Sequence, residues 1–250
     1  MMTSLVDRRR AHVAQYIPWM LRDYLTNQGP STMIVVLLIA FLAFRGFVPS
    51  SALRQMTDLE VGRLMRGLVG PLAYIGTFFA TNGIVATDRK QGYYKFLFAK
   101  PVNPPAYYLL TFVVYGVGLL LVTLALLLVW AILVRPILPV ELLAVVALMY
   151  LAFGGIGFFL SAAWRFDWLS LVTVVFVANA AWTLWADSTS ALHALLYLLP
   201  PVPRADEIYA IIARPYHVVP WGTVLWFGAY GLACLLAGLV VVRRRSLGTQ

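Results

Sequence analysis

Six long apolar stretches limit what this chain can fold into. They cover residues 32–48, 68–86, 106–134, 140–163, 169–186 and 221–242. A helix needs about 20 predominantly apolar residues to cross the hydrocarbon core of a bilayer, and no charged residue lies at the centre of any of the six. We therefore predict an all-α, polytopic membrane protein with six transmembrane helices and a single transmembrane domain over residues 1–250.

Composition supports the bilayer assignment and excludes other classes. Apolar residues make up 62% of the chain and charged residues 12%, against about 45–50% and about 25% in soluble domains. The net charge of +9 comes from basic residues at span ends and in loops, where they face lipid headgroups. We therefore expect a lipid bilayer and no nucleic acid as a partner. The single cysteine, Cys234, excludes a disulfide framework and a thiolate zinc cluster.

The segments between the spans give the predicted architecture. Residues 1–31 form a tail whose amphipathic helix, over 11–27, lies at the membrane interface and ends in a break at 27–31. Residues 49–67 form a polar connector that extends the second span as a helix. Residues 187–220 hold two helices too short to span, at 191–199 and 206–213, separated by prolines. We predict that this segment is an outer re-entrant hairpin.

Small residues in two spans predict close helix contacts. The second span carries Gly70, Gly76 and Gly83 among hydroxyl residues, and the fourth contains the run Gly154–Gly157. Small side chains let helix backbones approach closely. The second span is therefore expected inside the bundle.

Charge distribution orients the chain. Six spans put both termini on one side, and twelve of the nineteen basic residues then face the inside when the termini are cytoplasmic, against seven outside. Cytoplasmic loops carry the excess of Lys and Arg. We predict that both termini and residues 87–105 are cytoplasmic.

Several kinds of chemistry are missing from the sequence. No span centre carries the ionisable residue that marks an ion-driven carrier, and neither an H-E-x-x-H zinc pattern nor a G-x-S-x-G elbow occurs. The lysines Lys90, Lys95 and Lys100 are followed by Gln, Phe and Pro, whereas a phosphate-binding loop needs Lys followed by Ser or Thr. The chain is therefore not expected to be an enzyme, and ATP hydrolysis, if it is used, belongs to another polypeptide.

The polar residues within the spans admit two interpretations. They can form hydrogen bonds between helices, or they can line a substrate path. These residues are Thr77, Thr81, Asn82, Tyr115 and Asn179.

The central stretch, residues 87–105, separates two strongly apolar runs and holds every lysine in the protein. A polar start leads to the aromatic Tyr93–Phe98, and Pro101, Pro104 and Pro105 then prevent a continuous helix. The order predicts a short amphipathic helix along the membrane face, stopped by a turn. An ordinary polar loop is the alternative.

This stretch resembles the cytoplasmic loop of ABC-2 type permeases, the membrane subunits of ABC exporters. The resemblance extends to the topology of the whole chain, and it departs from the family at Lys100, which precedes the proline. The matching parts are Asp88-Arg89, Gly92, Phe96-Leu97-Phe98, Ala99, Pro101-Val102-Asn103 and Tyr107-Tyr108-Leu109-Leu110.

The resemblance implies a bacterial inner-membrane permease whose central helix docks into a groove of a separate ATPase. Two permeases, identical or different, and two ATPases would form the working unit, with ATP and Mg²⁺ bound by the ATPase and no cofactor in this chain. A secondary carrier or channel without an ATPase is the second hypothesis, and a membrane-embedded enzyme the third. The implied coupling residues are Asp88, Arg89, Lys90, Gly92, Tyr93, Tyr94, Lys95, Phe96, Phe98 and Pro101.

Overall fold

A computed structural model of the chain describes residues 14–47, 57–81, 84–85, 88, 103–133, 139–164, 167–185, 196–213 and 219–244. These ranges are mostly helical and contain no strand, which confirms the all-α class for the described part. The elements are α2 (Ile17–Asp23), η1 (Tyr24–Gln28), α3 (Gly29–Phe47), α5 (Asp58–Thr81), α8 (Pro104–Leu133), α9 (Pro139–Met149), η2 (Tyr150–Gly154), α10 (Gly155–Ala163), α11 (Asp167–Trp185), η3 (Val202–Arg204), α13 (Ala205–Ala213) and α14 (Trp221–Arg244).

A helix lies at each of the six predicted span positions. Three of the helical stretches are long and apolar enough to cross a membrane: Pro104–Ile132, Val140–Ala163 and Trp221–Arg244. Two further apolar helices, Leu72–Thr81 and Ser170–Trp185, are shorter. The chain is thus a membrane protein by helix length and composition, and the six-span topology stays a prediction.

The second predicted span differs from α5 at both ends. A helical extension of this span was expected, and α5 does begin early, at Asp58, where the Glu60 side chain caps the first turn. The Thr57 N–H donates to Glu60 Oε2 over 2.8 Å, and the Thr57 hydroxyl donates to the same oxygen over 2.9 Å. The predicted limit at residue 86 is too late, because residues 84 and 85 form a turn whose Val85 N–H donates to Ser161 Oγ over 3.3 Å.

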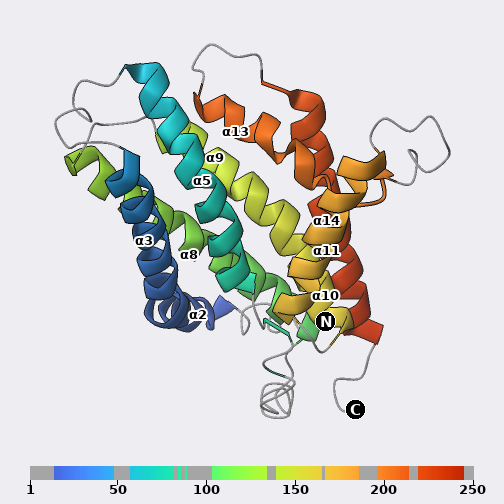
Figure 1. Ribbon diagram of the computed structural model, residues 1–250. Helices are drawn as coiled ribbons and strands as arrows, with labels where there is room; N and C mark the ends of the chain where they lie inside the picture. Colours follow the sequence, from blue (N-terminus) through green and yellow to red (C-terminus); the bar gives the residue numbers. More distant parts are fainter. Residues whose placement is uncertain are drawn as a thin grey trace.

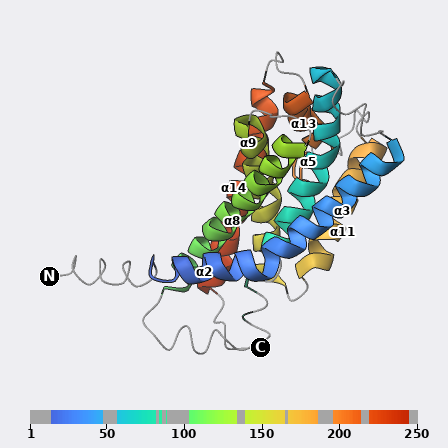
Figure 2. The same cartoon turned by 90° about the vertical axis from the view of Figure 1, so that its left-hand side faces the viewer.

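The predicted break at residues 27–31 is wrong. The π-helical turn η1 joins α2 to α3 without interruption, and the Gly29 N–H bonds to the Tyr24 carbonyl. A proline ring clashes with the carbonyl one turn before it, and a π turn accommodates such a clash by widening the helix and bending it. Pro30 therefore bends the chain here without ending the helix. In Figure 2, α2 lies across the base of the bundle and α3 rises from it at an angle.

Helix α2 is part of the predicted N-terminal helix. Its Met20 is buried, and so is Tyr24 directly after it, whereas the exposed side carries the apolar Ile17 and Trp19. The exposed side is therefore not uniformly polar. The interfacial position of this helix stays a prediction.

Helix α5 runs through the middle of the bundle, as the small residues of the second span predicted (Figure 1). It packs against α3, α8, α9, α13 and η2. A Cβ at Gly76 would lie 2.5 Å from a methyl carbon of Leu119 on α8, so a larger residue would force the Leu119 side chain to shift. Thr77 and Ala80 on the same helix are fully buried.

The run Gly154–Gly157 makes the close contact that was predicted for it. A Cβ at Gly155 would collide with the backbone carbonyl of Gly231 on α14. Two turns further along α14, a Cβ at Gly238 would lie 2.6 Å from the ring of Phe158. Helices α10 and α14 therefore touch backbone to backbone.

Helix α13 lies at the end of the bundle opposite to α2 (Figures 1 and 2). It corresponds to the predicted short helix at 206–213, and its Ile208 and Tyr209 are buried. The Tyr209 ring lies 3.8 Å from a Cβ built on Gly70 of α5. The predicted partner helix at 191–199 lies mostly outside the described residues, and its described end, from Tyr197, is a turn and a bend.

Candidate functional site

The N-terminal helix and the start of α8 meet in a polar and aromatic contact at the base of the bundle. The Tyr115 hydroxyl donates to Asp23 Oδ2 over 3.0 Å, and the Asn27 side-chain amide donates to Asp23 Oδ1 over 2.7 Å. Both oxygens of one carboxylate are thus engaged, one of them by a residue 92 positions away. A hydrogen bond to a charged group is stronger than a neutral one, so this pair fixes α2 against α8.

Aromatic rings extend the contact along both helices. The rings of Tyr16 and Tyr107 meet edge to face at 6.1 Å, and those of Tyr24 and Tyr115 lie 5.3 Å apart. Between them, the Thr111 hydroxyl donates to the Tyr107 carbonyl over 3.0 Å and lies 3.7 Å from Met20 Sδ. We call this set the tyrosine junction. Its members are Tyr16, Met20, Asp23, Tyr24, Asp88, Tyr107, Tyr108, Thr111 and Tyr115.

Asp88 brings the entrance of the central stretch into the junction. Burial raises the pKa of its carboxyl to about 6. A hydrogen bond with Tyr108 opposes this rise, and the charge of Asp23 adds to it. Two carboxyl groups therefore share one partly buried site with tyrosine hydroxyls, and removing a carboxylate from water disfavours its charged form.

Most of the predicted coupling residues cannot be placed. Arg89, Lys90, Gly92, Tyr93, Tyr94, Lys95, Phe96, Phe98 and Pro101 lie outside the described residues. Only Asp88 is described, and it lies at the junction together with the first turns of α8. The entrance of the central stretch, at Asp88, thus bonds to Tyr108 of α8 within reach of the charge of Asp23, and its exit into α8 bonds to Asp23 directly through Tyr115.

The predicted substrate-path residues do not form one continuous line. Thr77 and Thr81 are buried on α5, where the Thr81 hydroxyl donates to the Thr77 carbonyl over 2.8 Å. Tyr115 belongs to the tyrosine junction, and Asn179 is exposed on α11. Asn82 lies outside the described residues.

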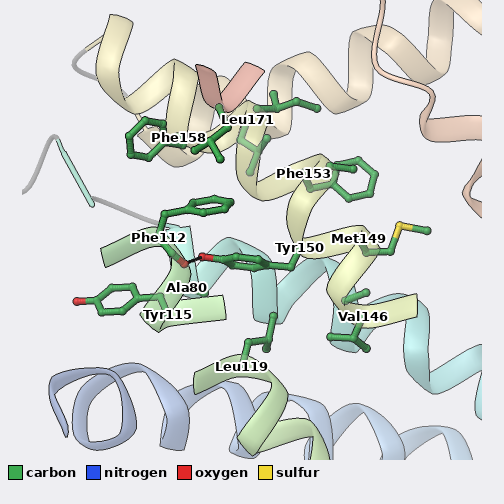
Figure 3. Packing of buried hydrophobic residues seen from close by; sticks show 14 of the residues in the cluster. Ala80, Phe112, Tyr115, Leu119, Val146, Met149, Tyr150, Phe153, Phe158 and Leu171 are labelled. Carbon is green, nitrogen blue, oxygen red and sulfur yellow. Dashed lines mark hydrogen bonds between the residues drawn. The ribbon is translucent and has the colours of Figure 1, made fainter. Parts of the chain in front are cut away.

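Packed aromatic side chains fill the space between Thr81 and Tyr115. The Tyr150 hydroxyl donates to the Phe112 carbonyl over 2.6 Å, and their rings lie 4.8 Å apart (Figure 3). A Cβ at Gly154 would lie 3.2 Å from both Phe112 and Thr81. In this conformation Thr81 therefore serves helix packing, which is the first of its two interpretations.

Sequence reasoning missed the acidic partner of the junction. Asp23 lies within the predicted amphipathic helix over 11–27, whose pattern gives it no partner, and in the structure it accepts the hydrogen bond of Tyr115. The available signal was the group of tyrosines at 107, 108 and 115 opening a long apolar helix. Tyrosine hydroxyls usually find a partner when they are buried, so such a group calls for an acceptor elsewhere in the chain.

Comparisons of the chain with protein-family models, with curated proteins and with solved structures give no match. No three His, Cys, Asp or Glu side chains converge as metal ligands in the part of the chain that the structure describes.

Proposed function

We propose that the chain is the permease subunit of an ABC transporter, an exporter of the ABC-2 type in a bacterial inner membrane. In this proposal it crosses the bilayer six times with both termini cytoplasmic, and residues 187–220 cover the outer end. It pairs with a second permease, identical or different. A separate ATPase binds ATP and Mg²⁺.

One observation carries the proposal: both flanks of the central stretch lie in the tyrosine junction, which also contains residues of the N-terminal helix. Asp88, at the entrance of the stretch, lies in the tyrosine junction, and α8, at its exit, bonds to Asp23 through Tyr115. An element that a partner pushes must be joined to the helices that it moves. The junction supplies this connection, because α2 continues through η1 into α3.

Coupling then works by differential contact energy. An ATPase that binds the central stretch more tightly in one conformation favours that conformation. Force on residues 89–102 reaches α8 through its first turn, α5 through residues 82–88, and α3 through the junction. The aromatic Tyr93, Tyr94, Phe96 and Phe98 would fill a groove of the partner, and Arg89, Lys90 and Lys95 would pair with acids at its rim.

A proton-coupled carrier is the second candidate, because of Asp88. A carboxyl with a pKa near 6 can exchange a proton close to neutral pH. Carriers hold their coupling ions near the bilayer midplane. Asp88, by contrast, follows the second predicted span and does not lie at the centre of a span. The permease is therefore the better-supported function.

The deciding experiment is Phe96→Pro in the full chain. A proline in a helix interior costs about 3 kcal/mol or more, so a coupling helix at Tyr93–Phe98 would be lost. Insertion should survive because it depends on the apolar spans. We expect the variant to reach the membrane at the level of the control Ser51→Pro, yet to lose ATPase binding in a pull-down and to lose ATP-dependent transport.

The two candidates give different results in this experiment. Normal pull-down and transport by Phe96→Pro would contradict the permease assignment. Flux from purified chain in vesicles, driven by a pH gradient without any ATPase, would establish the carrier instead.

A further inference from the structure

A second group of aromatic side chains lies at the opposite end of the molecule and surrounds one cation. Trp182 of α11, Tyr197 and Trp226 of α14 are mutual neighbours, with ring centroids 5.4 to 6.1 Å apart. The guanidinium of Arg204 lies 5.7 Å from the centre of the Trp182 ring and 5.1 Å from that of Trp226. We call these four residues the Arg204 cluster.

The cluster is held rigidly by contacts around it. Leu196 is buried against Trp182, and the Tyr230 hydroxyl donates to the Leu198 carbonyl over 3.0 Å, which ties the Tyr197 turn to α14. Arg204 itself ends the short helix η3, directly before α13. The position of its guanidinium is therefore set by elements from three parts of the chain.

The donors of Arg204 are available. Within the described ranges, no hydrogen bond or ion pair engages its side chain, and its guanidinium lies over two indole rings. The nearest acids along the chain are occupied elsewhere: Glu207 accepts the hydrogen bond of Thr223, and Asp206 lies near Tyr74 and Tyr209. A guanidinium that lies over aromatic rings keeps the N–H donors at its edge, in the fork that matches phosphate.

The position of the cluster identifies the source of the phosphate. Trp182 lies one turn before the end of α11 at Trp185, and Trp226 lies between one and two turns after the start of α14 at Trp221. At about 1.5 Å per residue, the cluster is about 5–8 Å inside both helix ends. Trp185 and Trp221 are exposed, and exposed tryptophans at helix ends mark headgroup depth in membrane proteins.

We propose that the Arg204 cluster is a binding site for the phosphate group of a lipid, with the guanidinium as a bidentate donor and the two indoles as its support. The proposal does not depend on the permease assignment, since it concerns a single chain without an ATPase.

The test uses purified full-length chain in a phosphate-free maltoside detergent. Dioctanoyl phosphatidic acid is titrated while thermal unfolding is followed, because a ligand that binds only the folded state stabilises it by an amount that grows with the logarithm of the ligand concentration above Kd, and so raises the melting temperature as that concentration rises. Dioctanoylglycerol, which has the same chains and no phosphate, is the ligand control. We expect only the phosphate-bearing lipid to raise the melting temperature.

Two substitutions at Arg204 separate charge from geometry. Arg204→Gln should weaken the apparent affinity about tenfold or more, since a charge-assisted hydrogen bond is lost. Arg204→Lys keeps the charge and lacks the fork, so its affinity should fall to an intermediate value. Arg243→Gln removes an exposed arginine near the end of α14 and should bind the lipid as the wild type does.

Water-soluble probes distinguish the sources of phosphate. Glycerol phosphate and inorganic phosphate should act only at much higher concentration when the ligand is a lipid. Equal potency would assign the same site to a soluble phosphate compound.

The proposal is overturned if Arg204→Gln binds phosphatidic acid as tightly as the wild type does, or if dioctanoylglycerol stabilises the protein equally. An equal loss in Arg243→Gln would also overturn it, by showing a general effect of charge. Should Arg204→Gln fail to fold, Arg204→Lys compared with wild type gives the same decision, because its cation still lies over the rings.

Discussion

The α10–α14 contact and the tyrosine junction both join helices far apart in the sequence, yet they do so by opposite means. Between α10 and α14, Gly155 and Gly231 bring two backbones together with no room for a methyl group. At the junction, Asp23 and Tyr115 meet through a hydrogen bond, and rings pack around them. One contact consists of backbone and the other of side chains.

This difference indicates which of the two contacts, the α10–α14 contact or the tyrosine junction, can rearrange. A backbone contact without spare volume has one arrangement, because close-packed interiors transmit strain instead of absorbing it. Side-chain hydrogen bonds and ring edges can exchange partners at modest cost, and the acid Asp88 changes charge near pH 6. We therefore assign α10 and α14 to a fixed unit, and α2, η1 and the start of α8 to the movable part.

The largest expected effect is that of Gly231→Ala on the fixed unit. The added Cβ of residue 231 would clash with the backbone of Leu151, and it would lie 2.6 Å from the Cα of Ala152. Overpacking typically costs about 1–3 kcal/mol, and backbone cannot rotate away as a side chain can, so we expect about 3 kcal/mol or more. Thermal unfolding of the purified protein measures the loss.

Gly228→Ala is the matched control on the same helix. A Cβ there would lie at an ordinary 3.8 Å from a methyl group of Leu148. Replacing glycine by alanine in a helix then stabilises it by about 0.5–1 kcal/mol. Equal stability of the two variants would show that α14 can move away from η2, the turn that leads into α10, which contradicts the fixed unit.

Tyr115→Phe should affect stability less than Gly231→Ala does. It should affect the coupling of transport to ATP hydrolysis more. It keeps the ring and removes the hydrogen bond to Asp23, so unfolding should become easier by about 1–2 kcal/mol. Transport per ATP hydrolysed should fall if the junction connects α2 to α8. Transport and ATP hydrolysis are measured together in vesicles that contain the ATPase, and unfolding is measured on the purified protein.

Tyr230→Phe controls for the loss of a tyrosine hydroxyl. It removes a hydrogen bond to the Leu198 carbonyl at the other end of the bundle. We expect a similar or smaller loss of stability without a change in transport per ATP. Should Tyr115→Phe behave in the same way, the junction would be a purely structural contact.

The sequence predicted the parts of the fold that depend on local pattern. Apolar runs located helices at six positions, and Gly154–Gly157 indicated a close contact, because lipid exposure and small side chains leave direct traces in the sequence. The early start of α5 also followed from its polar, helix-favouring connector. Each of these features is determined by neighbouring residues.

The remaining features depend on residues that are distant in the sequence. The turn η1 carries the helix past Gly29 and Pro30, which local rules treat as a break. Asp23 and Tyr115 are 92 positions apart, and no periodicity relates them. Likewise, no sequence pattern relates Trp182, Trp226 and Arg204, and only the fold brings the two indoles to the guanidinium. Such pairs require the tertiary arrangement.

The smallest expected effect tests whether the junction responds to pH. The pKa of Asp88 is raised from 3.8 to about 6 in the folded state, so the folded protein binds this proton more tightly than the unfolded chain does. The contribution of this group to stability is therefore fully present below pH 3.8 and is lost as the pH rises through about 6. Asp88→Asn cannot ionise and should keep its stability over this range.

We expect Asp88→Asn to unfold at a higher temperature than the wild type at pH 7.5, by a free energy on the order of 1 kcal/mol, and to approach the wild type near pH 4. Glu141→Gln, which removes an exposed carboxyl at the start of α9, should leave the pH dependence of the wild type unchanged. If Asp88→Asn follows the wild type at both pH values, the proton is bound elsewhere. The junction would then not change its charge with pH, which is one of its two differences from the α10–α14 contact. Only the Tyr115 hydrogen bond would then support the assignment of α2, η1 and the start of α8 to a movable part.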